Sequence, residues 1–185
     1  MNYLTFINGD RGIFVLKKLV KLKEYNPQGI IYCRKSLKKK LNVFSKKIDK
    51  IYLKDINSLK SEKILKDLNT DIFLIAGYPQ IFKKKIFSIP KIIVLNLHGG
   101  PLPSYRGGSP LNWQIINGKG KIGVSLVKIN SKIDGGKIID TKFFRLKLFQ
   151  DIKIAHKKAN KLFFIMVKNF FNNLQKKKKK IYKKK

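Results

Sequence analysis

Polar side chains that could donate hydrogen bonds and transfer protons follow one apolar segment of the chain. Asn96 and His98 stand two residues apart at the end of residues 91–97, and a glycine-rich turn containing Arg106 and Gly107 comes next. Successive side chains of a strand point to opposite faces, so Asn96 and His98 leave the same face. Because ligands of parallel sheets bind at the carboxyl ends of the strands, we expect an amide, an imidazole and a guanidinium to line one crevice.

The segments that must position these residues alternate between strand and helix patterns. The expected strands, which include segments apolar enough to be buried on both faces, cover residues 3–7, 29–33, 71–78 and 91–97. The expected helices cover residues 13–23, 58–68, 79–87 and 111–117, with Trp113 and Ile116 as core residues of the last one. Residues 34–47 fit either a helix or a loop. The pattern predicts an α/β fold in which helices flank a mostly parallel sheet, with an antiparallel edge formed by residues 122–148.

The C-terminal third predicts one long helix over residues 152–174 and a lysine-rich tail. Phe163, Phe164, Phe170 and Phe171 lie on this helix and favour either packing against the sheet of the same chain or a homodimer interface. Residues 176–185 are nearly all lysine and are expected to be disordered. We therefore divide the chain into a catalytic domain at residues 1–175 and a tail at residues 176–185.

The composition is strongly basic but does not by itself identify a ligand. Lysine and arginine number 43 against 10 acidic residues, a formal net charge of +33. Such a balance is typical of polyanion binding, yet few of these cations are arginine, the residue preferred for bidentate phosphate recognition. An AT-rich coding sequence produces the same abundance of lysine, isoleucine, asparagine and phenylalanine. We favour that interpretation over selection for a polyanion.

The cysteine content and the termini indicate a cellular compartment. Cys33 is the single cysteine, which excludes an intramolecular disulfide and a cysteine-based metal site. The first ten residues lack the long apolar core of a secretory signal, and no window reaches membrane-spanning length. We expect a soluble cytoplasmic protein that does not associate with membranes.

Several motifs in the same order resemble one enzyme family, the folate-dependent formyltransferases. They are Asn96-x-His98 with the following Pro-Leu-Pro, Tyr-Arg-Gly-Gly-Ser-Pro at 105–110, Trp-Gln-Ile-Ile-Asn-Gly at 113–118, and Asp134-Gly-Gly. The family includes methionyl-tRNA, glycinamide ribonucleotide and sugar N-formyltransferases. The resemblance implies a Rossmann-like domain that moves a formyl group from 10-formyltetrahydrofolate, a co-substrate, to a primary amine without a metal.

The chemistry of formyl transfer assigns a role to each of the three residues that the resemblance identifies. Attack of an amine on the formyl carbon creates an oxyanion and leaves an excess proton on the new ammonium. Asn96 is expected to donate to the oxyanion, and His98 to donate there or to pass a proton toward the leaving nitrogen. Asp134 is expected to orient the imidazole and accept the amine proton through water. Without the resemblance, Asp134 fits a turn residue equally well.

The remaining expected site residues bind the two substrates. The resemblance implies that Ala76, Gly77 and Tyr78, together with Asp134, shape the pocket of the folate co-substrate, although a core strand that ends in a turn explains Ala76 to Tyr78 as well. Arg106 and Gly107 are expected at the substrate, with a structural salt bridge as the alternative for Arg106. Asp10 and Arg11 are also expected to bind substrate, at the start of a helix, although a plain strand-to-helix turn explains Gly9 to Gly12 as well.

Three hypotheses about the function stay open, and the first two differ in the amine acceptor. The first is a small amine, because we see no second domain after the catalytic one. We expect a nucleotide-linked amino sugar in particular, because the motifs at 105–110 and 113–118 resemble the sugar and methionyl-tRNA branches more than the purine branch. The second is methionyl-tRNA, held by the cationic tail through its phosphates. The third is a polyanion-binding module that keeps the fold without catalysis. It requires Asn96 and His98 to be replaceable without effect.

Overall fold

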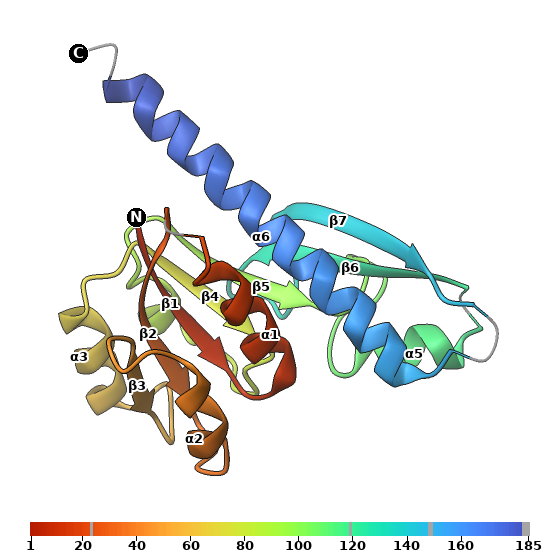
Figure 1. The fold of residues 1–185 in the computed structure, drawn as a ribbon, viewed down its shortest axis with the longest axis horizontal. Coiled ribbons are helices and arrows are strands. Elements are labelled where there is room, and N and C mark those ends of the chain that lie inside the picture. The colour runs from red at the N-terminus through yellow and green to blue at the C-terminus, as the bar shows by residue number, and fades with distance from the viewer. Residues whose placement is uncertain (23, 119, 148–149, 183–185) are drawn as a thin grey trace.

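Seven strands form one sheet in the computed structural model, which describes residues 1–182 except 23, 119, 148 and 149. The strands are β1 (Asn2–Ile7), β2 (Asn26–Tyr32), β3 (Asp49–Tyr52), β4 (Ile72–Ala76), β5 (Ile93–His98), β6 (Lys121–Lys128) and β7 (Ile138–Arg145). Their spatial order is β3-β2-β1-β4-β5-β6-β7; the first five are parallel, and β6 and β7 are antiparallel to their neighbours (Figure 1). The expected α/β fold with a mostly parallel sheet and an antiparallel edge is confirmed.

The order of the strands reverses beside β1, and this determines where a ligand can bind. β2 pairs with one edge of β1 and β4 with the other, although β3 intervenes between β2 and β4 in the sequence. At such a switch point the connections leave the sheet in opposite directions and open a crevice at the carboxyl ends of the strands. Ile7, Ala76 and His98 end β1, β4 and β5 at this edge.

Helices cover both faces of the sheet and create two hydrophobic cores. The helices are α1 (Asp10–Leu19), α2 (Leu37–Lys40), α3 (Leu59–Asp67), α4 (Lys84–Phe87), α5 (Pro110–Ile116) and α6 (Ile152–Tyr182), with a 3-10 turn at Leu41–Val43. Side chains of β1 alternate between the two cores, since Tyr3 and Ile7 pack on the face of α1 and α6 while Leu4 and Phe6 pack on the face of α3 and α4. Burial on both faces explains why these strands are almost continuously apolar.

The long helix α6 packs against the sheet of its own chain. Phe163 and Phe171 are fully buried in the core that α1 and α6 cover, while Phe164 and Phe170 are half-buried beside it. Packing against the parent sheet, one of the two interpretations of these phenylalanines, therefore accounts for the buried pair. A homodimer stays a prediction.

The end of α6 differs from the disordered tail expected at residues 176–185. The helix continues to Tyr182 and extends past the body of the domain (Figure 1), while residues 183–185 lie outside the described part of the chain. Lysine has a good helix propensity, and a helix that is already nucleated adds further residues at little cost. In the described part of the chain, no helix combines the length and the apolar character needed to cross a membrane.

Three elements differ from the expectations in their extent or orientation. The edge strand β3 was not expected, and residues 34–47 form only the short α2 and the 3-10 turn. The helix expected at residues 79–87 is reduced to α4, and the first part of that segment is a loop. On α5, Trp113 and Ile116 are 54% and 68% exposed and were wrongly expected in the core, because Leu111 and Gln114 occupy its buried face. The antiparallel edge expected over residues 122–148 ends at Arg145, and residue 148 is outside the described residues.

Candidate active site

Two polar side chains project from the carboxyl end of β5 on one face of the sheet. Leu95 and Leu97 point to the core beneath α1 and α6, so Asn96 and His98 leave the opposite face. In the antiparallel pairing with β6, Asn96 lies opposite Val127 and His98 opposite Ser125. Asn96 is half-buried, and the His98 side chain is only 5% exposed. Strand geometry therefore fixes both side chains before any ligand is present.

The third polar residue, Asp134, comes from the connection between β6 and β7. Its φ of 47° lies in the left-handed region, which non-glycine residues adopt rarely and which asparagine and aspartate tolerate best. Two residues later the chain passes so close to β6 that a Cβ on Gly136 would lie 1.7 Å from the carbonyl oxygen of Lys128. Only glycine fits there, and this close approach brings the Asp134 turn back over the end of β5.

The carboxylate of Asp134 joins the two residues of β5 to the glycine-rich loop. Asn96 Nδ2 lies 3.5 Å from Asp134 Oδ1, and His98 Nδ1 lies 3.5 Å from Asp134 Oδ2. The backbone N–H of Gly107 donates to the same Oδ2 at 2.9 Å. The three residues expected to act together, 38 positions apart at their extremes, thus meet in one cluster.

The imidazole of His98 lies between two hydrogen-bond acceptors. Nε2 donates to the carbonyl oxygen of Tyr105, while Nδ1 faces the Asp134 carboxylate. A neutral imidazole has one N–H donor, so both acceptors are satisfied together only when both ring nitrogens carry protons. The two contacts together fix the orientation of the ring at the edge of the crevice.

Buried side chains fix the loop that follows β5. The Gln114 amide accepts from Gly123 N at 2.7 Å and donates toward the carbonyl oxygens of Gly99 and Gly123 at 3.0 and 3.1 Å. Ser125 Oγ accepts from Leu102 N and donates to Gly100 O. These contacts satisfy buried backbone groups of an irregular segment, which explains why a polar residue occupies the buried face of α5.

A cavity of about 730 Å³ opens beside the cluster at the carboxyl ends of β4 and β5. Asn96, His98 and Asp134 line one side of it, and residues 77–82 line the other. Gly77 has a φ of 79°, which turns the chain sharply after β4, and the Tyr78 side chain is buried. Ala76 lies one residue further back and faces an adjoining cavity of about 600 Å³ rather than the large one. The size of the larger cavity and its few converging polar groups are typical of a small-molecule site.

Arg11 and Asp10 lie at the adjoining cavity, at the start of α1. Arg11 lines both cavities, donates from Nη1 to Leu97 O at 3.1 Å, and places its guanidinium 5.0 Å from the ring centre of Phe163. Burial lowers the pKa of Arg11 from 12.5 to about 10, so it stays charged at neutral pH. Asp10 is exposed and forms an ion pair with Lys40 at 3.1 Å.

Arg106 does not join the cluster. Its side chain is exposed, and it does not line either cavity among the described residues, whereas its neighbour Gly107 does. The turn that carries it is anchored through the Gly107 backbone and leaves the guanidinium in solvent. The structure therefore does not bring Arg106 into the crevice, and its role at a substrate stays a prediction.

Two residues of α6 at the cavities were not expected from the sequence. His156 lines both cavities, and its pKa is lowered by burial and by the nearby charge of Arg11. Asn160 is 8% exposed, lines the smaller cavity and has a buried Oδ1 without a hydrogen-bond partner. The available signal was a polar pair on the otherwise apolar face of α6, at spacing i and i+4.

Comparison with known proteins gives consistent family matches. The family model described as formyl transferase matches residues 34–153. The chain is 34% identical over 174 residues to the bifunctional polymyxin resistance protein ArnA of Wigglesworthia glossinidia brevipalpis, covering 88% of this chain and 26% of the relative. It is 41% identical over 100 residues to methionyl-tRNA formyltransferase of Mycoplasmopsis pulmonis, covering 51% and 34%. The chain thus spans about a quarter to a third of the length of these relatives.

A solved structure with low sequence identity has the same fold. Glycinamide ribonucleotide transformylase 1 from Symbiobacterium toebii superimposes with a TM-score of 0.77 at 13% identity, over 94% of this chain and 88% of that one. At this identity the match concerns the fold, including the Rossmann-like order of the strands.

Proposed function

Because the chain belongs to the formyl transferase family, we propose that it transfers a formyl group from 10-formyltetrahydrofolate to a primary amine. The observation that carries this proposal is the convergence of Asn96, His98 and Asp134 on one cavity. An amide donor, an imidazole and a carboxylate are the groups that acyl transfer to an amine requires. The nitrogen of the amine forms a bond to the formyl carbon, the bond from that carbon to the folate nitrogen breaks, and one proton moves from the amine to the folate.

Each residue of the cluster has a role that its contacts support. Asn96 Nδ2 points toward Asp134 at a long 3.5 Å and is free to turn toward a developing oxyanion, since catalytic contacts often tighten only with substrate bound. In this proposal His98 is the proton donor to the oxyanion or to the leaving nitrogen. Asp134 orients His98 through Nδ1 and receives the proton of the amine through water.

The cavity fits the folate co-substrate in its size and chemistry. Its wall beyond Gly77 offers exposed backbone groups and apolar side chains, which suit the hydrogen-bonding edge and the flat faces of a pterin. Gly77 and Tyr78 are the proposed contacts, with Asp134 at the reacting end. Ala76 does not line this cavity, so in this proposal it only ends β4 and positions Gly77 and Tyr78.

The proposed acceptor is a small amine, specifically a nucleotide-linked amino sugar. The smaller cavity supports this assignment, because Arg11 is charged and the first turn of α1 places backbone N–H groups and a positive dipole there. Asp10 lines the same smaller cavity, whereas Gly107 lines the larger one. In this proposal Arg11 binds an anionic part of the acceptor, and Arg106 does not.

Methionyl-tRNA is the second candidate acceptor. The 41% identity to the M. pulmonis methionyl-tRNA formyltransferase favours it, as does the basic end of α6. Phosphate contacts by lysine make binding strongly salt-dependent. A chain ending at residue 175 should then lose turnover on charged tRNA, whereas turnover on an amino sugar nucleotide should be unchanged.

The test is an acceptor screen with the full chain. Purified protein is incubated with 10-formyltetrahydrofolate and either amino sugar nucleotides, other small amines or methionyl-tRNA, and release of tetrahydrofolate is measured. Arg11→Ala should raise the KM for an anionic acceptor about tenfold, and Arg106→Ala should leave it unchanged. Absence of tetrahydrofolate release with every acceptor would overturn the proposed activity.

A further inference from the structure

One side of the large cavity is a loop without regular structure, Gly77–Lys83, which we call the wall loop. Six consecutive residues of this loop, 77–82, line the cavity. Tyr78 and Phe82 are buried and pack edge-on against Phe6, whereas Ile81 is 66% exposed. The loop is thus pinned by two aromatic side chains, and the backbone between them lacks strand or helix partners.

The side-chain amide of Gln80 bonds the wall loop to a neighbouring segment, Lys54–Asn57, which we call the brace. Gln80 Oε1 accepts from Ile56 N at 2.7 Å, and Gln80 Nε2 donates to Lys54 O at 2.7 Å. The amide therefore takes the place of a backbone unit in a strand pairing, with one donor and one acceptor satisfied. Its contacts lie at the middle of the loop, where no backbone pairing holds it.

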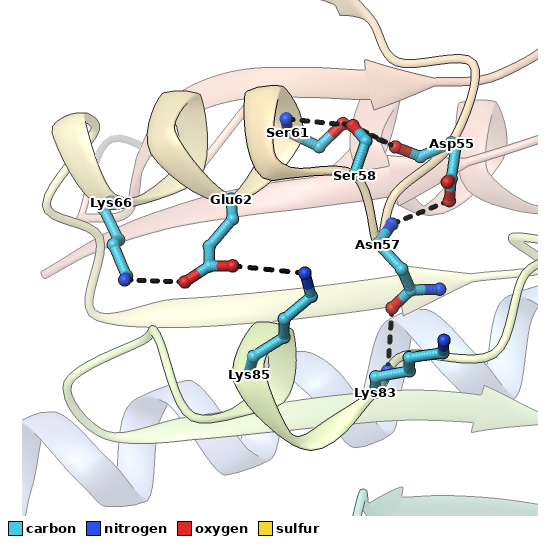
Figure 2. A network of polar contacts seen from close by, with 8 residues as sticks. All are labelled: Asp55, Asn57, Ser58, Ser61, Glu62, Lys66, Lys83 and Lys85. Atoms are coloured by element: carbon cyan, nitrogen blue, oxygen red, sulfur yellow. Dashed lines mark hydrogen bonds and ion pairs between the residues drawn. The ribbon is translucent and has the colours of Figure 1, made fainter.

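A second amide, that of Asn57, makes the reciprocal connection from the brace. Asn57 Nδ2 donates to Ile81 O at 2.9 Å, and Lys83 N donates to Asn57 Oδ1 at 2.9 Å. Figure 2 shows the Asn57 side chain reaching across from the brace to the backbone of Lys83. Four hydrogen bonds from two side chains thus join the wall loop to the brace.

The brace itself is held rigidly at the start of α3. Ser61 Oγ donates to Asp55 O at 2.6 Å, Ser58 caps α3 by accepting from Ser61 N, and Asn57 N donates to Asp55 Oδ1 (Figure 2). The Ile56 side chain is fully buried in the core beneath α3 and α4. A segment anchored in this way can impose its position on the loop that it contacts.

We propose that Asn57 and Gln80 are positioning residues that hold the wall loop in the shape that binds the folate co-substrate. The assignment rests on the proposed function and goes beyond it by naming residues that act through the loop: Asn57 does not line the cavity, and Gln80 lines it while its amide bonds to the brace. The contacts are exposed or half-buried, so water can replace them when an amide is removed. Loss of either amide then frees the wall loop locally and leaves both hydrophobic cores intact.

The experiment compares Asn57→Ala and Gln80→Ala with a matched control in the same network. Glu62 forms ion pairs with Lys66 at 2.7 Å and Lys85 at 3.4 Å, joining α3 to α4 without contacting the wall loop (Figure 2). Both amide variants should raise the KM for the folate co-substrate and the Kd for tetrahydrofolate about tenfold, with kcat within about twofold of the unmodified chain. Glu62→Ala should leave both constants unchanged.

A hydrogen-exchange measurement provides a readout of the loop itself. The amide of Lys83 should lose protection in Asn57→Ala and that of Ile56 in Gln80→Ala, with protection in β1 and β4 unchanged. An unchanged KM and Kd in both variants, or an equal rise in Glu62→Ala, would overturn the positioning role. If the unmodified chain releases no tetrahydrofolate and binds none, the proposed function fails first, which separates the two outcomes.

Discussion

The two sides of the large cavity are constructed in different ways. On the polar side, Asn96 and His98 belong to a central strand, and Asp134 is held by a close backbone approach at Gly136. On the other side, the wall loop is irregular and depends on side-chain amides from a neighbouring segment. Catalytic groups must lie within a fraction of an ångström of their working positions, whereas an apolar binding surface tolerates small shifts. The comparison predicts that rate and affinity are supported by separate parts of this fold.

The largest effect is expected from removal of Asn96, the proposed oxyanion donor on the polar side. Asn96→Ala should lower kcat roughly 10²- to 10³-fold, because removal of one oxyanion donor typically lowers the kcat of an acyl-transfer enzyme by this factor. The KM for the folate co-substrate should stay within about twofold, since the wall loop is untouched. Steady-state kinetics gives both numbers. A raised KM with an unchanged kcat would show that the two sides are not separable in this way.

Asp134→Asn tests the carboxylate on the same side. The substitution keeps the shape and an acceptor for Gly107 N, but it removes the negative charge opposite His98 Nδ1. We expect kcat to fall about 10²-fold, the contribution typical of proton transfer by a positioned side chain. The thermal unfolding midpoint serves as the control, and a large decrease in it would indicate that Asp134 matters for the turn instead.

A smaller effect is expected from the apolar side, through Ile81→Ala. Removal of an exposed side chain that lines the cavity should raise the KM for the folate co-substrate about fivefold through lost apolar contact, with kcat unchanged. Ile116→Ala is the matched control, because Ile116 is 68% exposed on α5 and does not line the cavity. Equal effects of the two variants would contradict a binding role for the wall loop.

The smallest effect is a change in the pH dependence of stability at His156, a residue of α6 that belongs neither to the polar cluster nor to the wall loop. Burial and the Arg11 charge lower its folded pKa below the ordinary 6.5, so below pH 6.5 the unfolded chain binds the proton more readily. The stability that comes from this difference is present above pH 6.5 and is lost as the pH falls toward the folded pKa. His156→Gln should therefore flatten the acid side of the unfolding free energy measured against pH by denaturant titration. An unchanged slope would exclude His156 as its source.

Much of the fold could be predicted from the sequence, because burial on both faces makes the central strands apolar. The Asn96-x-His98 spacing likewise placed both side chains on one face. The charged edge strand β3 gave no such signal, since it is short and half-exposed. Apolar periodicity on the two-turn α5 could not tell which face meets the core, and a buried glutamine that bonds backbone groups decided it.

The positions of Arg11 and Arg106 show another limit of prediction from the sequence. Arg11 and Arg106 both follow strands in glycine-containing turns, and both were expected at a substrate. Arg11 lies on the first turn of α1, which points into the switch point of the sheet, whereas Arg106 sits on the outside of a loop anchored through Gly107. The direction of a side chain in an irregular loop depends on contacts with residues that are distant in the sequence. The spacing of residues within a motif does not contain this information.

The outward orientation of α5 provides a natural spectroscopic reporter. Trp113 is the single tryptophan of the chain and is more than half exposed, one residue from Asn112 at the cavity. Indole emission moves to shorter wavelength and changes in intensity when water is displaced from the ring. Intrinsic fluorescence can therefore report a large acceptor that covers α5, and it stays silent when a small ligand settles deep between the strand ends.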